Sequence, residues 1–513
     1  MTTANNSANQ WAWILDDSIV DTQIHGESYD PQSIARAADA SVVVALRLHL
    51  DGEPEEALRV LSARANDPDA LLLSGQILFE LKRYREAGAS YSRLAQKHAE
   101  HPFANFNCGL CMARIGDWEV AAANLRRAVI LDPDLMKAWF ALGVCLLNQN
   151  LPADAKACFT RNLRLIPDYA PALFGMAAAL QIEERHGEAL AIYERMLEAQ
   201  PEREALLGNA LAAAMDFGDF GKASALAKRL LKVCPEAASA LQALYAISAG
   251  QGECADAIKW CRKLAETRPL TFSELHGLGV CHQRVGHHED AVRAFDQALQ
   301  LSPDDIDSTE GLAQSLSELS DSARAKAAWR RLLELKPEQA DYWVRLGLLY
   351  YEGGELLEAA KAFESCVRQD GDSLAGWLNL GAAYWSAGDT HRSREAFKAA
   401  LEIDPASIPA RRGLSALAIV SGDAAAAESY RNGLSSEDWE ITYNIAVLHQ
   451  SQGNLERAAS LYREVLNGQA KFAEARLNLG NILFALGDIE QSKESWRVAL
   501  QERPDLASNF LGC

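Results

Sequence analysis

The chain has 513 residues, of which 49% are hydrophobic, and its formal net charge is −20. That apolar share supports a substantial core, and the recurrence of Ala, Leu, Glu and Arg without alternating Val, Ile and Thr runs predicts an all-helical protein. Binding to phosphates requires concentrated Lys and Arg, so we expect neither nucleic acid nor an anionic membrane surface as the partner of so acidic a chain. Protein or peptide partners with basic or apolar surfaces are expected instead.

The sequence shows no pattern for export or membrane insertion. Its opening residues, MTTANNSANQ, lack the basic and apolar regions of a secretory signal, and no apolar stretch is long enough to span a bilayer. Ten cysteines are scattered through a long chain, which is unlike a small disulfide-linked domain. We therefore expect a reducing, cytoplasmic location.

Residues 1–37 are predicted to form an acidic N-terminal extension. From Met1 to Ala35 there are five acids and no Lys or Arg, and the run Trp11–Leu15 (WAWIL) is an apolar cluster. Such a cluster is unusual for a disordered tail, because disorder goes with low hydrophobicity. Two roles stay open: a strap that covers the edge of the structure that follows, or a segment that docks in a groove of the same or a neighbouring molecule. Docking in a neighbour would make a homo-oligomer.

A repeat with a period of 34 residues dominates the rest of the chain. Leu142 and Leu278 begin two similar stretches that lie 136 residues, or four periods, apart. The eighth position of the repeat is small, at Gly75, Gly109, Gly143, Ala177, Gly279, Gly347, Gly381, Ala446 and Gly480. The twentieth is usually Ala, and the twenty-fourth is a large apolar residue, at Tyr91, Phe159, Tyr193, Phe295, Trp329, Phe363, Phe397, Tyr462 and Trp496.

These positions have physical roles. Small residues let two antiparallel helices approach closely, and the large residue fills the groove between repeats. Gly-Asp turns such as Gly218-Asp219 end the first helix, and a Pro often ends the second because it lacks a backbone N–H. One helix pair cannot bury its apolar face, so neighbouring pairs are expected to stack. The frame places fourteen repeats over residues 38–504, starting near Ala38, Pro68, Pro102, Met136, Ala170, Glu204, Ala238, Phe272, Ile306, Ala340, Leu374, Ile408, Trp439 and Ala473.

This pattern closely resembles the tetratricopeptide repeat (TPR) family. The resemblance implies an all-α fold, a right-handed α-solenoid superhelix of antiparallel helix pairs. It also implies that the first helix of each pair, helix A, lines a concave groove. Positions 2, 5, 6, 9, 12 and 13 of the repeat would reach into that groove.

The first repeat is about four residues short of the period, and two further places depart from the regular frame. The twelfth repeat is three residues short, and Arg431 stands where an aromatic residue is usual. A hinge near residues 424–438 and a tolerated loop shortening are both open, since loops vary in length at little cost. The tail, Asp505–Cys513, is too short for a closing helix, so the last repeat is expected to expose an edge to a partner or a second copy.

Asparagine recurs at position 6 of the repeat, a slot expected to face the groove. The set comprises Asn107, Asn209, Asn379, Asn444 and Asn478, with Asn481 at position 9 of the last repeat. An amide both donates and accepts hydrogen bonds, so it pairs with a peptide backbone whatever the peptide sequence. The set resembles the asparagine ladder in the TPR domain of O-linked N-acetylglucosamine transferase, although Gly413 interrupts it here. An ordinary consensus role for these residues is the alternative.

Phenylalanine occupies position 5 in three consecutive repeats, at Phe106, Phe140 and Phe174. An aromatic stripe on the groove face would form a protein-binding surface. Packing of these rings between neighbouring helices is the alternative, because aromatic residues at repeat spacing are common in cores.

No residue pattern predicts catalysis. Cys108 and Cys111 form a lone C-x-x-C within one helix, where they serve as small apolar fillers. His276 and His282 cannot share a helix face, and His287 lies in a turn, so solvated histidines are expected rather than a metal site. Nucleotide-binding and nucleophile-elbow motifs do not occur, and the repeats leave no stretch long enough for a catalytic domain. We expect no enzyme, no cofactor and no metal.

The array, the asparagines and the acidic surface together favour a non-enzymatic scaffold or adaptor that binds an extended peptide or partner helix. A self-assembling structural protein is the first alternative. The second is a non-catalytic targeting subunit of an enzyme carried on another chain.

Overall fold

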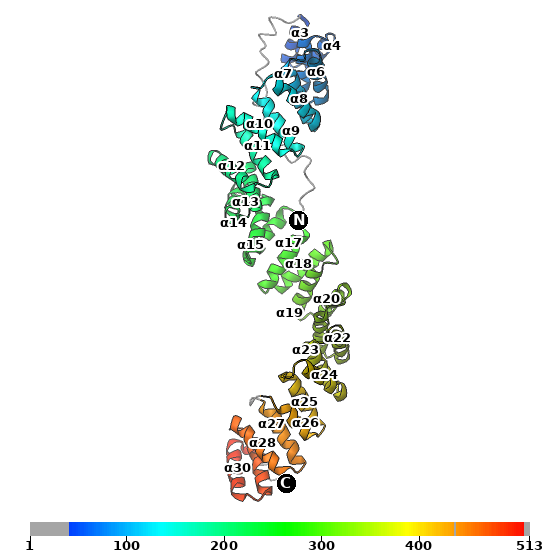
Figure 1. The fold of residues 1–513 in the computed structure, drawn as a ribbon, viewed down its shortest axis with the longest axis vertical. Helices are drawn as coiled ribbons and strands as arrows, with labels where there is room; N and C mark the ends of the chain where they lie inside the picture. Colours follow the sequence, from blue (N-terminus) through cyan, green and yellow to red (C-terminus); the bar gives the residue numbers. More distant parts are fainter. Residues whose placement is uncertain (1–39, 435–437, 507–513) are drawn as a thin grey trace. The chain divides into compact units, whose positions relative to one another are not determined.

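The computed structural model describes residues 40–434 and 438–506. Helices fill these ranges and no strand occurs within them, so the predicted all-α fold is confirmed (Figure 1). The predicted N-terminal extension with its Trp11–Leu15 cluster lies outside the described residues. The chain divides into two compact bodies, Met1–Pro269 and Leu270–Cys513, which we call the N-terminal and C-terminal bodies.

The described part of the N-terminal body consists of seven helix pairs. Its A helices are α3 (Ala40–Leu50), α5 (Pro68–Glu80), α7 (Pro102–Arg114), α9 (Met136–Asn148), α11 (Ala170–Ile182), α13 (Glu204–Phe217) and α15 (Ala238–Gly250). The B helices that follow them are α4 (Pro54–Ser62), α6 (Tyr84–Lys97), α8 (Trp118–Leu131), α10 (Pro152–Leu165), α12 (His186–Ala199), α14 (Phe220–Val233) and α16 (Cys254–Thr267).

The C-terminal body repeats the arrangement. Its A helices are α17 (Phe272–Arg284), α19 (Ile306–Glu318), α21 (Ala340–Glu352), α23 (Leu374–Ser386), α25 (Ile408–Val420), α27 (Trp439–Ser451) and α29 (Ala473–Ala485). Its B helices are α18 (His288–Leu301), α20 (Ser322–Leu335), α22 (Leu356–Gln369), α24 (Thr390–Ile403), α26 (Ala424–Arg431), α28 (Leu455–Gly468) and α30 (Ile489–Glu502). From α5 onward, every A helix begins at the residue where the 34-residue frame starts a repeat.

A short turn with a left-handed residue joins the helices of each pair. Gly218 follows α13 with φ 82°, and Asp219 then accepts a hydrogen bond from the backbone N–H of Lys222 at 3.0 Å, where α14 begins. The carboxylate satisfies one of the backbone donors that the start of a helix leaves free. The Gly-Asp dipeptide therefore ends one helix and starts the next.

The large residue at position 24 packs between two successive A helices. A Cβ added to Gly143, at position 8 of the same repeat, would lie 2.6 Å from the ring of Phe159. A Cβ on Gly175, at position 6 of the next repeat, would lie 2.5 Å from the same ring. The ring thus joins one repeat to the next, and the core runs along the stacked pairs of each body.

The twelfth repeat is short because its B helix is short. Helix α26 has eight residues, whereas the neighbouring B helices α24 and α28 have 14 each. Arg431 occupies its position 24 and donates hydrogen bonds to Glu464 Oε1 at 2.7 Å and to Thr442 Oγ1 at 3.3 Å. A guanidinium held by polar partners replaces the usual aromatic contact between repeats. The predicted hinge near residues 424–438 stays a prediction, and residues 435–437 lie outside the described ranges.

At the C-terminal end, Pro504–Leu506 forms one 3-10 turn after α30. Leu506 is buried against Leu477 and Ala499 of the last repeat. Every helix in the described ranges is too short to cross a lipid bilayer.

Candidate functional site

In the C-terminal body, the side of each A helix that faces away from its own B helix contributes to one surface. Neighbouring A helices are in contact from α17 to α19 and from α21 to α27, and hydrogen bonds link some of their side chains across these contacts. The hydroxyls of Tyr351 and Ser386 lie 2.8 Å apart, and Gln283 Nε2 donates to Gln314 Oε1 at 3.1 Å. We call this surface, made by positions 2, 5, 6, 9, 12 and 13 of the repeats, the A-face.

The three phenylalanines of the sequence analysis lie in the core of the N-terminal body. Phe106 and Phe140 are each 3% exposed and Phe174 is 7% exposed. The centroid of the Phe140 ring is 6.1 Å from that of Phe159, and Phe174 lies 5.5 Å from Tyr193. In the repeats of Phe140 and Phe174, position 5 therefore packs on the position-24 ring of the same repeat. This is the packing role that the sequence left open as the alternative to binding.

The same pairing recurs in the C-terminal body. The His276 ring lies 5.9 Å from Phe295, and the Tyr443 ring lies 5.7 Å from Tyr462. Position 5 thus lies where the A-face meets the core, and its side chain packs on the ring of helix B in these repeats. The sequence frame alone does not distinguish these two places, because both lie on the same helix.

The predicted asparagines divide into two groups. Three make hydrogen bonds inside the protein: Asn209 Nδ2 to Ala205 O at 2.8 Å, Asn478 Nδ2 to Tyr443 Oη at 3.1 Å, and Asn481 Oδ1 from Trp496 Nε1 at 2.9 Å. The side-chain amides of Asn107, Asn379 and Asn444 make no hydrogen bond to any described residue, and Asn444 is exposed. Their use as peptide contacts, and the likeness to the transferase ladder, stay predictions.

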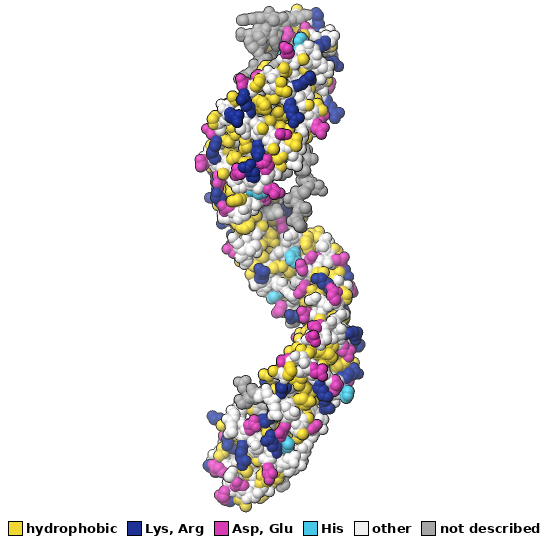
Figure 2. Space-filling model, in the orientation of Figure 1, with side chains coloured by type: hydrophobic (Ala, Val, Ile, Leu, Met, Phe, Trp, Pro, Cys, Tyr) yellow, Lys and Arg dark blue, Asp and Glu magenta, His cyan; other side chains and the backbone are white. Residues whose placement is uncertain are grey.

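An apolar stripe on the A-face was not among the predicted site residues. It crosses four consecutive A helices and comprises Val344, Leu348 and Tyr351 of α21, Leu378, Ala382 and Trp385 of α23, Ala416, Ile419 and Val420 of α25, and Val447 of α27. Trp385 is 37%, Val420 67% and Val447 39% exposed, and the others are half-buried. Hydrophobic side chains are visible at the level of α23 to α25 in Figure 2. In the sequence, the apolar residues at positions 9 and 12 of the tenth to twelfth repeats could have indicated this stripe.

The A-face beside this stripe is acidic. The Tyr342 hydroxyl donates to Glu310 Oε2 at 2.9 Å, across the contact between α19 and α21. Burial, that hydrogen bond and the negative charges of Glu310, Asp307 and Asp341 raise the pKa of Tyr342 to about 12. The shift indicates that carboxylates from both helices share one region of the surface.

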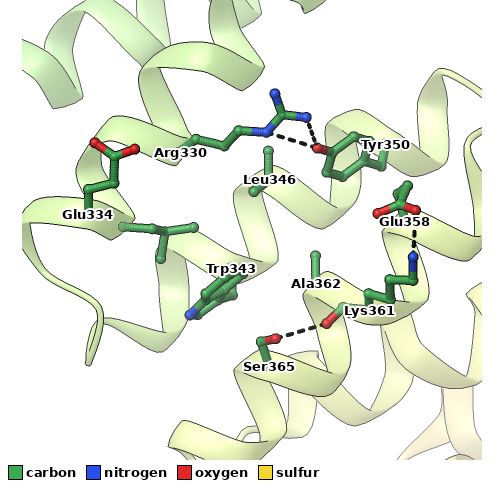
Figure 3. Close-up of a pocket in the computed structure, with 10 residues that line it drawn as sticks. Arg330, Glu334, Trp343, Leu346, Tyr350, Glu358, Lys361, Ala362 and Ser365 are labelled. Atoms are coloured by element: carbon green, nitrogen blue, oxygen red, sulfur yellow. Dashed lines mark hydrogen bonds and ion pairs between the residues drawn. The ribbon is translucent and has the colours of Figure 1, made fainter.

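On the B side, a pocket of about 420 Å³ lies among α20, α21 and α22. Figure 3 shows Trp343, Leu346 and Ala362 between the charged side chains of its rim. Two of these charges have partners within the pocket wall. Arg330 Nε donates to the Tyr350 hydroxyl at 3.0 Å.

The second partnered charge is Lys361, which pairs with Glu358 at 2.7 Å. The indole N–H of Trp343 is buried without an acceptor among the described residues, whereas Trp377, at the same repeat position, donates to Gly371 O at 2.8 Å. Because the charged side chains Arg330, Glu358 and Lys361 already have partners in the wall, the pocket has fewer free polar groups for a ligand than the A-face has.

Three groups that could ligate a metal come together in the eighth repeat. Ligand atoms of His282, His287 and Asp290 lie within 4.8 Å of one another, and Asp290 also pairs with Arg293. His282 Nδ1 lies 3.9 Å from Asp290 Oδ2, farther than the roughly 3.4 Å that separates two ligands of a tetrahedral zinc ion. His276 takes no part, since its Nδ1 lies 2.8 Å from the Ser308 hydroxyl. We assign no metal to it.

The cysteines in the predicted C-x-x-C are buried thiols. Burial raises the pKa of Cys108 to about 11 and raises that of Cys111 further. A thiol is nucleophilic and metal-binding only as the thiolate, which burial disfavours. Both side chains therefore behave as apolar fillers.

Stacked helix pairs with an open A-face define the chain as an α-solenoid repeat protein. Family models described as tetratricopeptide repeat match residues 51–104, 113–170, 272–305, 310–373, 374–407 and 449–508, which together make up more than half of the chain. The chain belongs to the tetratricopeptide repeat family. Proteins of this family are in general protein-interaction scaffolds.

Several solved structures are similar at low identity. A chain of the Naa15/Naa10 complex bound to HypK-THB is 13% identical with a TM-score of 0.35, and the match covers 90% of this chain and 79% of that one. MamA from residue 41 to the end, from Desulfovibrio magneticus RS-1, is 19% identical with a TM-score of 0.30, covering 33% and 97%. A chain of the APC/C hetero-tetramer Cut9–Hcn1 is 14% identical with a TM-score of 0.27, covering 79% and 95%. No curated protein sequence matches the chain.

Proposed function

We propose that the chain is a non-catalytic scaffold or adaptor that binds an extended peptide or a partner helix on the A-face of the C-terminal body. The observation that carries the proposal is the partly buried apolar stripe across α21, α23, α25 and α27, of which Trp385, Val420 and Val447 are exposed. Contiguous apolar surface that remains in contact with water marks interaction sites. Asn379 and Asn444 lie on two of the same helices, and their amides can pair with a partner backbone.

A pull-down from native lysate, read by mass spectrometry, tests this proposal. Val420→Asp places a charge in the stripe at a side chain that is 67% exposed. Leu357→Asp is the matched control, because Leu357 is 69% exposed on the B helix α22. We expect Val420→Asp to lose partners that the wild type and Leu357→Asp both retain. Equal recovery by all three proteins would contradict the proposal.

The asparagines are tested in the same pull-down. Asn379, Asn444 and Asn478 are replaced together by Ala, and circular dichroism checks that the variant keeps its helices. Loss of the stripe-dependent partners is expected if these amides contact the partner backbone, since each lost hydrogen bond costs about 1 kcal/mol. Retention of all partners would remove the asparagines from the site and leave the stripe. An enzyme among the lost partners would identify the chain as a targeting subunit.

Self-assembly is a second candidate, favoured by apolar residues on the last repeat. Phe484 is 56%, Leu486 43% and Ile489 49% exposed. Sedimentation velocity at increasing concentration would show growth that Phe484→Ser with Leu486→Ser, or deletion of residues 1–35, abolishes. A constant sedimentation coefficient over the concentration range would reject this candidate.

A further inference from the structure

Four carboxylates on the A-face of α19 and α21 are exposed and unpaired. Asp307 and Glu318 belong to α19, and Asp341 and Glu352 belong to α21. None of the four forms an ion pair with any residue in the described ranges. Arg345 is the one cation among the A-face positions of α19, α21 and α23. The region therefore carries a concentrated negative charge.

Some acids on the B helices form ion pairs with a cation of a neighbouring B helix. Arg324 Nη2 of α20 contacts Asp296 Oδ2 of α18 at 2.8 Å, and Lys222 of α14 contacts Glu194 of α12 at the same distance. Such pairs join residues on neighbouring B helices, and they neutralise some of the acids there. Other exposed acids on B helices, such as Glu289 and Glu402, form no ion pair with a described residue. The A-face of α19 and α21 differs in that four such acids are grouped around a single cation, Arg345.

Two of the unpaired acids lie at the C-terminal ends of helices, where negative charge is unfavourable. Glu318 is the last residue of α19, and Glu352 is the last residue of α21. The C-terminal end of a helix carries partial negative charge, so a carboxylate there is less favourable than a cation. A basic partner would offset this cost as well as the repulsion between the carboxylates.

The acidic region and the apolar stripe meet on α21. Leu348 and Tyr351 belong to the stripe, and Asp341 and Glu352 lie on the same helix. Packed helices lie about 9 Å apart, so the distance from α19 to α25 is about 27 Å. An extended chain covers that distance in about eight residues.

Resting on the proposed function, we infer that the bound partner is an extended segment of about eight residues with Lys or Arg at one end and large apolar residues at the other. The basic end lies against α19 and α21, and the apolar end lies against α23 and α25. The Asn379 amide, between these two ends, pairs with the backbone of the segment.

The first test uses a random 12-residue peptide library displayed on phage and panned against the full chain. Peptides that also bind Val420→Asp are subtracted. We expect the remaining peptides to carry a net positive charge confined to one end and apolar residues at the other. Enriched peptides that are neutral or acidic would overturn the inference and leave the proposed function standing. If no peptide depends on the stripe, peptide binding on this face, and the inference with it, is rejected.

The second test reverses the charge of the acidic region. Glu318→Lys with Glu352→Lys should weaken the binding of an enriched, fluorescein-labelled peptide at least about five-fold at low salt, a loss that 0.5 M NaCl reduces. Lysine suits a helix C-terminus, so the variant should fold at least as well as the wild type. Glu338→Lys with Glu402→Lys, two exposed acids off the A-face, makes the same change in net charge and should leave the affinity unchanged.

Fluorescence anisotropy reads both variants against the wild type. Equal affinities for the two double variants would overturn the inferred basic end. The proposed function would survive that result if Val420→Asp still abolished binding.

Discussion

At the residue scale, two of the rings at position 24 lie directly against a glycine at position 6 of the next repeat. Gly311 would bring a Cβ to 2.4 Å from Phe295, and Gly413 would bring one to 2.6 Å from Phe397. At these two places a side chain at position 6 would collide with the ring as it now lies. Asn379 nevertheless follows Phe363 at the same pair of positions, so the ring by itself does not exclude a side chain there.

Gly311→Ala tests this packing. The added methyl group has to displace the buried Phe295 ring, so we expect a loss of about 1–3 kcal/mol in the free energy of unfolding. Adding Phe295→Leu should restore part of the stability in the double variant, because it removes the colliding ring. Urea denaturation followed by circular dichroism measures both. Additive losses in the double variant would show that the two side chains do not compete for space.

A second prediction at this scale concerns Glu428, which accepts hydrogen bonds from Arg457 at 2.7 and 2.8 Å and lies 2.6 Å from His449 Nε2. These contacts, that of Arg457 first, hold the pKa of Glu428 below its usual value. A depressed carboxyl pKa stabilises the fold above the ordinary value of about 4.3, and the contribution disappears as the pH falls through the folded pKa.

Glu428→Gln should therefore cost about 1 kcal/mol near pH 6 and progressively less below pH 4. Urea denaturation of the wild type and the variant across this pH range measures the difference. A difference that stays constant down to pH 3 would show that ionisation of Glu428 does not support the fold.

At the element scale, the short B helix α26 is the weak point of the C-terminal body. It buries only Ala424 and Ala427, whereas α28 buries Ala458, Leu461, Tyr462 and other residues. A helix with few buried apolar contacts opens at lower free energy than its neighbours. The hinge suggested by the sequence would have its physical basis in this shortened helix.

Hydrogen exchange read by mass spectrometry tests the weak point. We expect the backbone amides of α26 to exchange at least about ten-fold faster than those of α24 or α28, since about 1.4 kcal/mol of lost protection corresponds to that factor. Helix α4 has only nine residues as well, so it serves as the internal control for the effect of helix length. Equal protection of α24, α26 and α28 would argue against a hinge in the twelfth repeat.

At the scale of the whole molecule, stability is distributed along the stack. Each repeat of a solenoid contacts only its neighbours, so a block of complete repeats keeps its own core. The division after Pro269 falls between two repeats, before α17 begins at Phe272. The apolar stripe and the acidic region lie wholly in the C-terminal body.

Residues 270–513 expressed alone should therefore fold and bind the enriched peptide with the affinity of the full chain. Circular dichroism and fluorescence anisotropy measure the two properties. A fragment of residues 290–513, which lacks α17 and exposes the core face of α18, serves as the comparison and should be less stable. Failure of the longer fragment to fold would show that the C-terminal body depends on the N-terminal one.

The sequence by itself determined the repeat, the helical fold and the starts of the A helices. These features depend on short-range rules that recur along the array: a small residue at most of the places where helices approach, a left-handed turn in each repeat, and in six repeats an Asp that caps helix B. The 34-residue spacing also brought the asparagines to one repeat position. Local sequence rules, repeated along the chain, were sufficient to predict the helices and the repeat position of the asparagines.

Only the tertiary structure decided which side chains remain open on the A helices. Phe140 and Trp385 are both aromatic residues at expected groove positions, yet Phe140 is 3% exposed and Trp385 37%. Phe140 packs on the Phe159 ring of its partner B helix and on Tyr169, whereas Trp385 has no ring contact among the described residues. Glu318 and Asp296 are likewise alike in sequence, but only Asp296 has a cation on the adjacent helix. Burial and charge pairing depend on neighbours about 30 residues away, which local patterns do not specify.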